Sequence, residues 1–237
     1  MVRSAAAPLR AAAGRPRAAR PGISLAPGMT VGLYGGSFNP AHQGHAHVAR
    51  TALRRLGLDR VIWLVSPRNP LKPAEGTADL DARLGETARW ALGRAMVVSD
   101  VERRIGTRYT IDTVRWLKRR FPGVRFVWIM GADSLADFHR WRGWADLARE
   151  VPIVVVSRPG VALRSRFSPF TRRFAAARRP AGAARTLAAL APPAWIYLPA
   201  PFHPVSSTAL RNSRLTPPPV RGMGAIIQPA PGASADL

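Results

Sequence analysis

Three of the five histidines in this 237-residue chain lie within six positions, shortly after a pair of glycines. Gly35 and Gly36 follow an apolar run, and His42, His45 and His47 come behind them. Glycine lacks a Cβ atom, so the backbone can turn tightly there and approach a ligand closely. Amides at the start of a following helix, helped by the helix dipole, can bind a phosphate. The segment therefore predicts a phosphate-handling site.

The spacing of the histidines separates two of them from the third. His42 and His45 are three residues apart, so a helix that starts here places both imidazoles on one face, beside the phosphate. Imidazole can donate to a developing phosphate charge near neutral pH, which suits phosphoryl or nucleotidyl transfer. Two alternatives stay open. One is a helix start with plain surface histidines, and the other is a metal site that adds His47, although His47 points away from His45 on a helix.

The elements that must position these residues alternate between apolar strands and amphipathic helices. Periodicity predicts strands at residues 30–36, 60–66, 95–100, 124–130, 151–157 and 194–200. It predicts helices at residues 44–58, 80–92 and 109–121. Strands this apolar need cover on both faces, which predicts an α/β fold with a doubly wound, mostly parallel, Rossmann-like sheet. Such sheets bind ligands at the carboxyl ends of their strands, and the histidines follow the first strand.

Composition narrows the class of protein. The chain has no cysteine, which excludes disulfides and thiolate metal sites and fits a reducing compartment, so we expect a cytoplasmic protein. It has no run of 18 apolar residues, so we expect no membrane span. The net charge of +23 invites a nucleic-acid partner. More than half of that charge comes from arginines in residues 1–28 and 158–185, so we expect no nucleic-acid binding.

Both arginine-rich stretches consist mainly of Ala, Arg, Pro and Gly, a composition typical of disordered or loosely held segments. We therefore expect residues 1–28 to be a disordered basic tail and residues 158–185 to be a loose insertion in one domain. The first stretch also has the composition of a transit peptide, and Met29 is an alternative start of translation. The Pro- and Gly-rich residues 214–237 are expected to form an irregular C-terminal tail.

Two motifs give the chain a resemblance to a known superfamily. GGSFNPAHQGH, residues 35–45, resembles the G-[TS]-F-[DN]-P-x-H-x-G-H signature of the nucleotidylyltransferases. VSSTALR, residues 205–211, resembles their distal I-S-S-T-x-[IV]-R motif. The stretches SPRNPLK, RYTIDTV and GADSLADFHRWRGWADL make the chain most similar to the bacterial nicotinate-nucleotide adenylyltransferases. The resemblance implies a nucleotidyltransferase domain over residues 29–213.

The resemblance also implies a reaction. Adenylyl transfer from ATP to nicotinate mononucleotide would give nicotinate adenine dinucleotide and pyrophosphate, a step of NAD biosynthesis. Mg²⁺ would accompany the ATP phosphates, with no metal site of the protein's own and no covalent enzyme intermediate. A sister transferase that uses nicotinamide mononucleotide or phosphopantetheine stays open as an alternative, and a basic nucleic-acid-binding protein as a distant one. The sequence predicts no particular oligomeric state.

Site residues follow from the same resemblance. The implied catalytic residues are His42 and His45. The implied ATP-binding residues are Gly35, Gly36, Ser37, Phe38, His42, His45, Gly131, Asp133, Ser206, Ser207, Thr208 and Arg211. The implied mononucleotide-binding residues are Lys72, Thr110, Ile111 and Trp141. Backbone amides of Thr110 and Ile111 would bind the nicotinate carboxylate, and Trp141 would stack on the pyridine ring.

Overall fold

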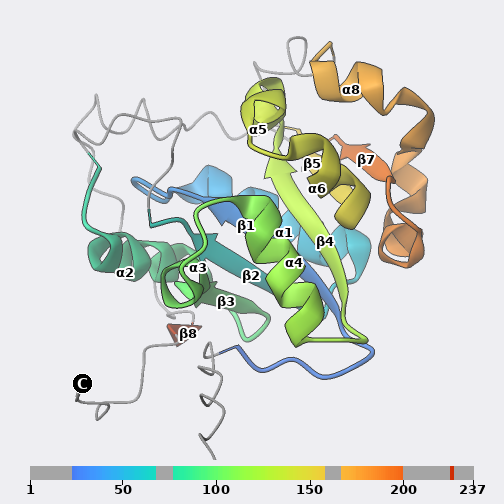
Figure 1. Ribbon diagram of the computed structural model, residues 1–237. Helices are drawn as coiled ribbons and strands as arrows, with labels where there is room; N and C mark the ends of the chain where they lie inside the picture. Colours follow the sequence, from blue (N-terminus) through green and yellow to red (C-terminus); the bar gives the residue numbers. More distant parts are fainter. Residues whose placement is uncertain (1–22, 68–76, 158–166, 200–224, 227–237) are drawn as a thin grey trace, which may run out of the picture.

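A parallel β-sheet forms the centre of the protein in a computed structural model that describes residues 23–67, 77–157, 167–199 and 225–226 (Figure 1). Six strands match the predicted ones: β1 (Thr30–Gly36), β2 (Arg60–Val65), β3 (Met96–Ser99), β4 (Arg125–Gly131), β5 (Ile153–Val156) and β7 (Trp195–Leu198). Two-residue strands lie at the two edges of the sheet: β6 (Arg178–Arg179) and β8 (Ala225–Ile226). All neighbouring strands run parallel.

The strand order is β6-β7-β5-β4-β1-β2-β3-β8. From β1 the chain moves outward to β2 and β3, then returns past β1 to β4 and continues in the other direction to β5 and β7. This reversal confirms the predicted doubly wound fold. The order reverses between β1 and β4, so a ligand is expected at the carboxyl ends of these two strands.

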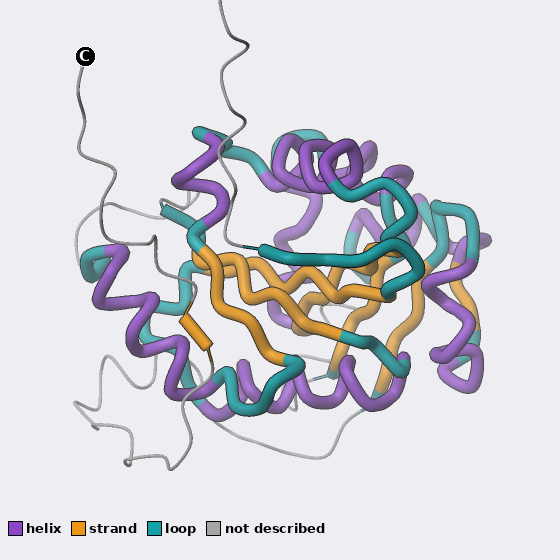
Figure 2. The backbone as a smooth tube through the Cα atoms, turned by 90° about the horizontal axis from the view of Figure 1, so that it is seen from below, coloured by secondary structure: helices purple, strands orange, loops and turns teal. Residues whose placement is uncertain are grey.

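Helices cover both faces of the sheet (Figure 2). One face carries α1 (Gln43–Leu56), α2 (Leu80–Trp90) and the 3₁₀ segment η3 (Ala181–Ala189). The other face carries α3 (Val101–Ile105), α4 (Thr110–Arg120), α6 (Trp144–Glu150) and α8 (Pro169–Arg173). The remaining short elements are α5 (Ala132–Asp137), η1 (Phe138–Arg140) and η2 (Ala175–Ala177). Within the described residues, no helix combines the length and apolar character needed to cross a bilayer.

The alternation of side chains along the strands explains the two buried layers. In β2, Val61 and Trp63 pack with α1 and α2, whereas Ile62 and Leu64 pack with α4. All four side chains are at most 1% exposed. A sheet buried on both faces needs such continuous apolar strands, which is why the sequence predicted it correctly.

The helices predicted at residues 44–58, 80–92 and 109–121 form as α1, α2 and α4. In α1, the buried side chains include Val48 and Leu56, and Gly57 ends the helix in the left-handed conformation with a φ of 66°. In α4, Ile111 and Leu117 belong to the buried stripe. Each helix therefore has one face fixed on the sheet and its first turn held at the carboxyl edge.

The segments predicted to be tails or a loose insertion, residues 1–28, 158–185 and 214–237, are described only in part. Ile23 is buried in the core and the Gly28 amide donates to the Gly123 carbonyl at 2.9 Å, so residues 23–28 pack on the domain. Residues 167–185 also pack on it, with Phe170 only 1% exposed. Residues 1–22, 158–166 and most of 214–237 lie outside the described residues, and the division into tails and domain stays a prediction.

A close aromatic contact joins β1 to β4. A Cβ atom on Gly35 would lie 2.5 Å from Cη2 of the Trp128 ring, which is itself 1% exposed. The ring therefore occupies the space that any larger residue at position 35 would need. Gly35 is required for packing between the two strands at the point where the strand order reverses.

We expect Gly35→Ala to destabilise the protein by about 1–3 kcal/mol, because the rigid indole cannot yield without disturbing the core. Gly85→Ala is the matched control: its Cβ atom meets nothing within 4 Å in α2, and alanine should stabilise the helix by up to about 1 kcal/mol. Urea unfolding measures both changes. A Gly35→Ala variant as stable as the wild type would contradict this packing account.

Candidate active site

The turn that leads into the histidines is made by Phe38. Gly35 and Gly36 continue β1 without a positive φ, and aromatic rings occupy the space beside them. Phe38 has a φ of 46°, a conformation that is strained for a bulky residue. Its ring is 2% exposed and stands edge-on to Tyr34 at 5.4 Å, so packing compensates the strain. The expected tight turn therefore lies at Phe38, two residues beyond Gly36, and both glycines pack against aromatic rings.

His42 and His45 together cap the first turn of α1. His42 is the N-cap residue, and its Nδ1 accepts a hydrogen bond from the Gly44 amide at 3.1 Å. Nδ1 of His45 accepts from the His42 amide at 3.2 Å. Reciprocal bonds of this kind form a capping box. The ring centroids lie 3.9 Å apart, which confirms that the spacing places both imidazoles on one side of the helix.

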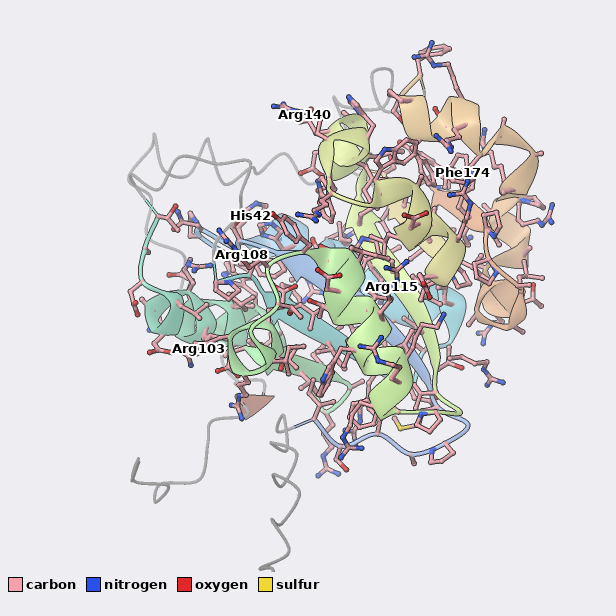
Figure 3. The ribbon with its side chains drawn as sticks, viewed as in Figure 1. His42, Arg103, Arg108, Arg115, Arg140 and Phe174 are labelled. Carbon is pink, nitrogen blue, oxygen red and sulfur yellow. The ribbon has the colours of Figure 1, made fainter. Side chains whose placement is uncertain are left out.

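The capping box fixes where each neutral imidazole carries its proton. Because both Nδ1 atoms accept hydrogen bonds, the proton must sit on Nε2. In each ring, Nδ1 then accepts a hydrogen bond from a backbone amide at the start of α1, and Nε2–H is a hydrogen-bond donor. His42 is 1% exposed, and the Phe38 ring stands edge-on to His45 at 5.1 Å, so packing restrains both rings. Figure 3 shows His42 at the carboxyl edge of the sheet.

The Ser37 hydroxyl is a further polar group in this loop. Its Oγ is buried and has no hydrogen-bond partner among the described residues. Buried polar atoms are normally paired, so a hydroxyl in this position is suited to bind a ligand atom. It lies in the same loop as the two histidines, between the end of β1 and the start of α1.

The start of α4 forms the second part of the candidate site. Thr110 and Ile111 are its first two residues, and the N-cap residue Tyr109 makes no side-chain capping bond. Such a helix start offers amide donors to an anion. The Arg142 guanidinium lies 4.6 Å from the centre of the Tyr109 ring, and the Cβ position of Gly143 lies 3.2 Å from Ile111. The segment that follows Trp141 therefore packs against this helix start.

Trp128 connects the two parts. Its ring lies beside Gly35 on one side and stands edge-on to Trp141, with 6.1 Å between the ring centroids. Trp141 is half-buried and also contacts Phe138 at 5.4 Å. The buried Trp128 ring thus contacts both β1, which precedes the histidines, and Trp141, which is predicted to stack on the pyridine ring.

The other predicted residues divide into described and undescribed ones. Gly131 is the last residue of β4, and Asp133 is exposed in the first turn of α5, so both lie at the carboxyl edge. Lys72, Ser206, Ser207, Thr208 and Arg211 lie outside the described residues.

A metal site was one alternative for the histidine cluster. Among the ranges that the structure describes, no three His, Cys, Asp or Glu side chains come together as metal ligands. His42, His45 and His47 are all described, so they do not form the three-histidine site.

Two buried charged residues near this edge were not predicted from the sequence. Arg83 of α2 donates to the carbonyl oxygens of Ser37 and Ser66, each at 2.8 Å. Glu102 of α3 accepts a hydrogen bond from Thr113 of α4 at 3.2 Å. Burial raises the pKa of Glu102 to about 7, against the hydrogen bonds from the Thr113 and Ser66 side chains, which lower it. For both residues, the sign in the sequence is a charged side chain at a helix position that faces the sheet.

Comparison with known proteins places the same region in one class. The cytidylyltransferase-like family model matches residues 33–213, so fold and site define a nucleotidyltransferase of this class. A relative from Caulobacter sp. (strain K31) named "Probable nicotinate-nucleotide adenylyltransferase" is 62% identical over 184 residues, 78% of this chain and 97% of the relative. A relative of the same name from Cereibacter sphaeroides is 55% identical over 183 residues, 77% of this chain and 97% of the relative.

Solved structures share the fold at much lower identity. Plasmodium falciparum nicotinic acid mononucleotide adenylyltransferase complexed with APC aligns with a TM-score of 0.56 at 14% identity, over 78% of this chain and 83% of that one. The same enzyme complexed with NaAD aligns with a TM-score of 0.55 at 13% identity over the same shares. On the sequence matches, this chain belongs to the nicotinate-nucleotide adenylyltransferase family.

The buried Glu102 gives a pH-dependent stability. Its pKa is about 7 in the folded protein and 4.5 for an ordinary glutamate, so the unfolded chain releases this proton first as the pH rises. Between pH 4.5 and about 7, wild-type stability should therefore fall by up to about 3 kcal/mol relative to Glu102→Gln, which cannot ionise. Urea unfolding across this window measures the difference.

Glu150→Gln is the control of opposite sign. Hydrogen bonds from Lys118 and Arg115 lower the pKa of the Glu150 carboxyl, so its contribution is present above the ordinary pKa and is lost on acidification. A difference between Glu102→Gln and wild type that stays constant from pH 4.5 to 7 would contradict the buried neutral carboxyl.

Proposed function

We propose that this chain transfers the adenylyl group of ATP to nicotinate mononucleotide, giving nicotinate adenine dinucleotide and pyrophosphate in NAD biosynthesis. Family membership supports the reaction. The observation that carries its chemistry is the capping box, which sets two imidazole donors side by side at the carboxyl end of β1. A triphosphate needs such donors where charge develops during transfer.

The chemical step is an in-line displacement at the α-phosphorus of ATP. A phosphate oxygen of the mononucleotide forms the new bond to this phosphorus, and the bond to the bridging oxygen of the β-phosphate breaks. Pyrophosphate leaves with that electron pair, and no bond to the enzyme forms. In this proposal the Nε2–H groups of His42 and His45 donate to the phosphate oxygens as their charge grows, with the Ser37 hydroxyl as a further contact.

The start of α4 supports recognition of the acceptor. The backbone N–H groups of Thr110 and Ile111 can donate hydrogen bonds to the negative nicotinate carboxylate, a charge that the neutral amide of nicotinamide lacks. Trp141 offers a flat face for the pyridine ring. Gly131 at the end of β4 and Asp133 in the first turn of α5 are assigned to the adenosine side. Phosphate contacts are assigned to Lys72, Ser206, Ser207, Thr208 and Arg211.

Mg²⁺ enters this proposal as part of the MgATP substrate. It would neutralise charge on the phosphates while the histidines hold their oxygens. In this proposal the ion arrives with the substrate, and no residue of the chain is assigned to hold it. We further predict that the reaction takes place in the cytoplasm and involves no nucleic acid.

Pyrophosphate release tests the function directly. Incubated with ATP and Mg²⁺, the full chain should turn over rapidly with nicotinate mononucleotide and at least about tenfold more slowly with nicotinamide mononucleotide, because the α4 amides select an anion. Phosphopantetheine serves as a control acceptor and should give no product. Equal rates with the acid and the amide, or no release with either, would remove this assignment.

His45→Gln tests the role of the imidazoles apart from the helix cap. Glutamine at the third helical position can still accept from the N-cap amide, so the fold should persist. Turnover should fall at least about 100-fold, the scale expected when a charge-stabilising donor is misplaced, because the flexible glutamine amide does not hold an N–H where the rigid imidazole holds Nε2–H. His47→Gln, on another side of α1, should keep wild-type turnover. A stable His45→Gln variant with retained turnover would show that the ring serves the cap alone.

A further inference from the structure

Arg83 is a buried arginine whose hydrogen bonds all go to backbone carbonyls. It is 3% exposed, yet none of the described carboxylates forms a salt bridge with it. Its Nε donates to the Ala78 carbonyl at 2.9 Å, and its terminal nitrogens donate to Ser37 and Ser66 at 2.8 Å and to Pro67 at 3.0 Å. Four of the five guanidinium N–H groups are thereby used.

These carbonyls belong to segments that are far apart in the sequence. Ser37 follows β1 and opens the histidine loop, whereas Ser66 and Pro67 follow β2. The two strands pair up to this point, since the Ser66 amide donates to the Gly36 carbonyl at 3.0 Å. Beyond Ser66 the strands separate, and the hydrogen bonds of the Arg83 guanidinium connect the two loops. Arg83 therefore fixes the distance between the two loops where they leave the sheet.

The bond to Ser37 also orients a peptide group. In a planar trans peptide the C=O and N–H bonds point in opposite directions. Because the Ser37 carbonyl points at the Arg83 guanidinium, the N–H of Phe38 in the same peptide points away from it. Burial disfavours the charge of Arg83 and lowers its pKa, with the Asp79 carboxylate in partial opposition, so the four backbone bonds are what satisfies the buried guanidinium donors.

We propose that Arg83 is a positioning residue for adenylyl transfer, which holds the Ser37–Phe38 peptide and the end of β2 in the geometry that the phosphates require. The inference rests on the proposed function. Lysine keeps the charge but has one donor nitrogen, which cannot reach four carbonyls from two loops. Loss of the guanidinium should then loosen the loop that carries His42 and His45 without removing either imidazole.

The test compares Arg83→Lys and Arg83→Gln with Arg89→Lys, a control on the exposed side of the same helix. Thermal unfolding of each full chain sets a temperature at which it is folded, and pyrophosphate release there gives kcat and KM for ATP and nicotinate mononucleotide. We expect kcat to fall about 10- to 100-fold in both Arg83 variants, with KM values within about threefold of wild type, as for misplaced reacting groups. Arg89→Lys should match the wild type.

Three results would overturn the proposal. The first is an unchanged kcat in folded Arg83→Lys and Arg83→Gln, because the arginine would then stabilise the fold alone. The second is full activity in Arg83→Lys with loss only in Arg83→Gln, because charge and not loop geometry would matter. The third is failure of both variants to fold at any temperature. A wild-type chain without adenylyl transfer would instead refute the proposed function, which the same assay shows separately.

Discussion

The site depends on one local interaction, the reciprocal capping of α1 by His42 and His45. A helix start leaves amides that need acceptors, and here two imidazoles supply them through Nδ1. With Nδ1 engaged in the cap, the proton of each neutral ring lies on Nε2, the donor that the proposed function assigns to the phosphates. Under the proposed function, helix stability and phosphate chemistry place the same demand on these two residues, because a carboxylate cap such as Asp would satisfy the amides without offering an N–H donor.

The rest of the fold supports this cap from three sides. Phe38 adopts a strained turn that packing of its ring maintains, and it also packs edge-on to His45. Trp128 occupies the space beside Gly35 and packs edge-on against Trp141, so it links β1 to the segment of Trp141. Arg83 ties the loop to the end of β2. Rigid neighbours on all of these sides suit a reaction in which positioning of phosphates does most of the work.

Sequence periodicity predicted what depends on regular patterns and missed what depends on distant backbone atoms. The strands and α1 and α4 followed from apolar runs and stripes, and the two histidines from spacing. The helices α5, α6 and α8 are only five to seven residues long, too short for a periodic signal. Arg83 was missed because its partners are carbonyls up to 46 residues away, which no side-chain pattern records. The glycine pair was found, but the packing of Gly35 against Trp128 and of Gly36 against Phe38 can be seen only in the folded protein.

The most direct test of this account is the nitrogen NMR spectrum of the histidine side chains in the full ¹⁵N-labelled chain, with signals assigned through single His→Gln variants. The capping box predicts that neutral His42 and His45 carry their proton on Nε2, and that MgATP leaves this tautomer unchanged. An Nδ1–H tautomer at either residue would contradict the account, because that nitrogen could then no longer accept the backbone amide that holds the ring in place.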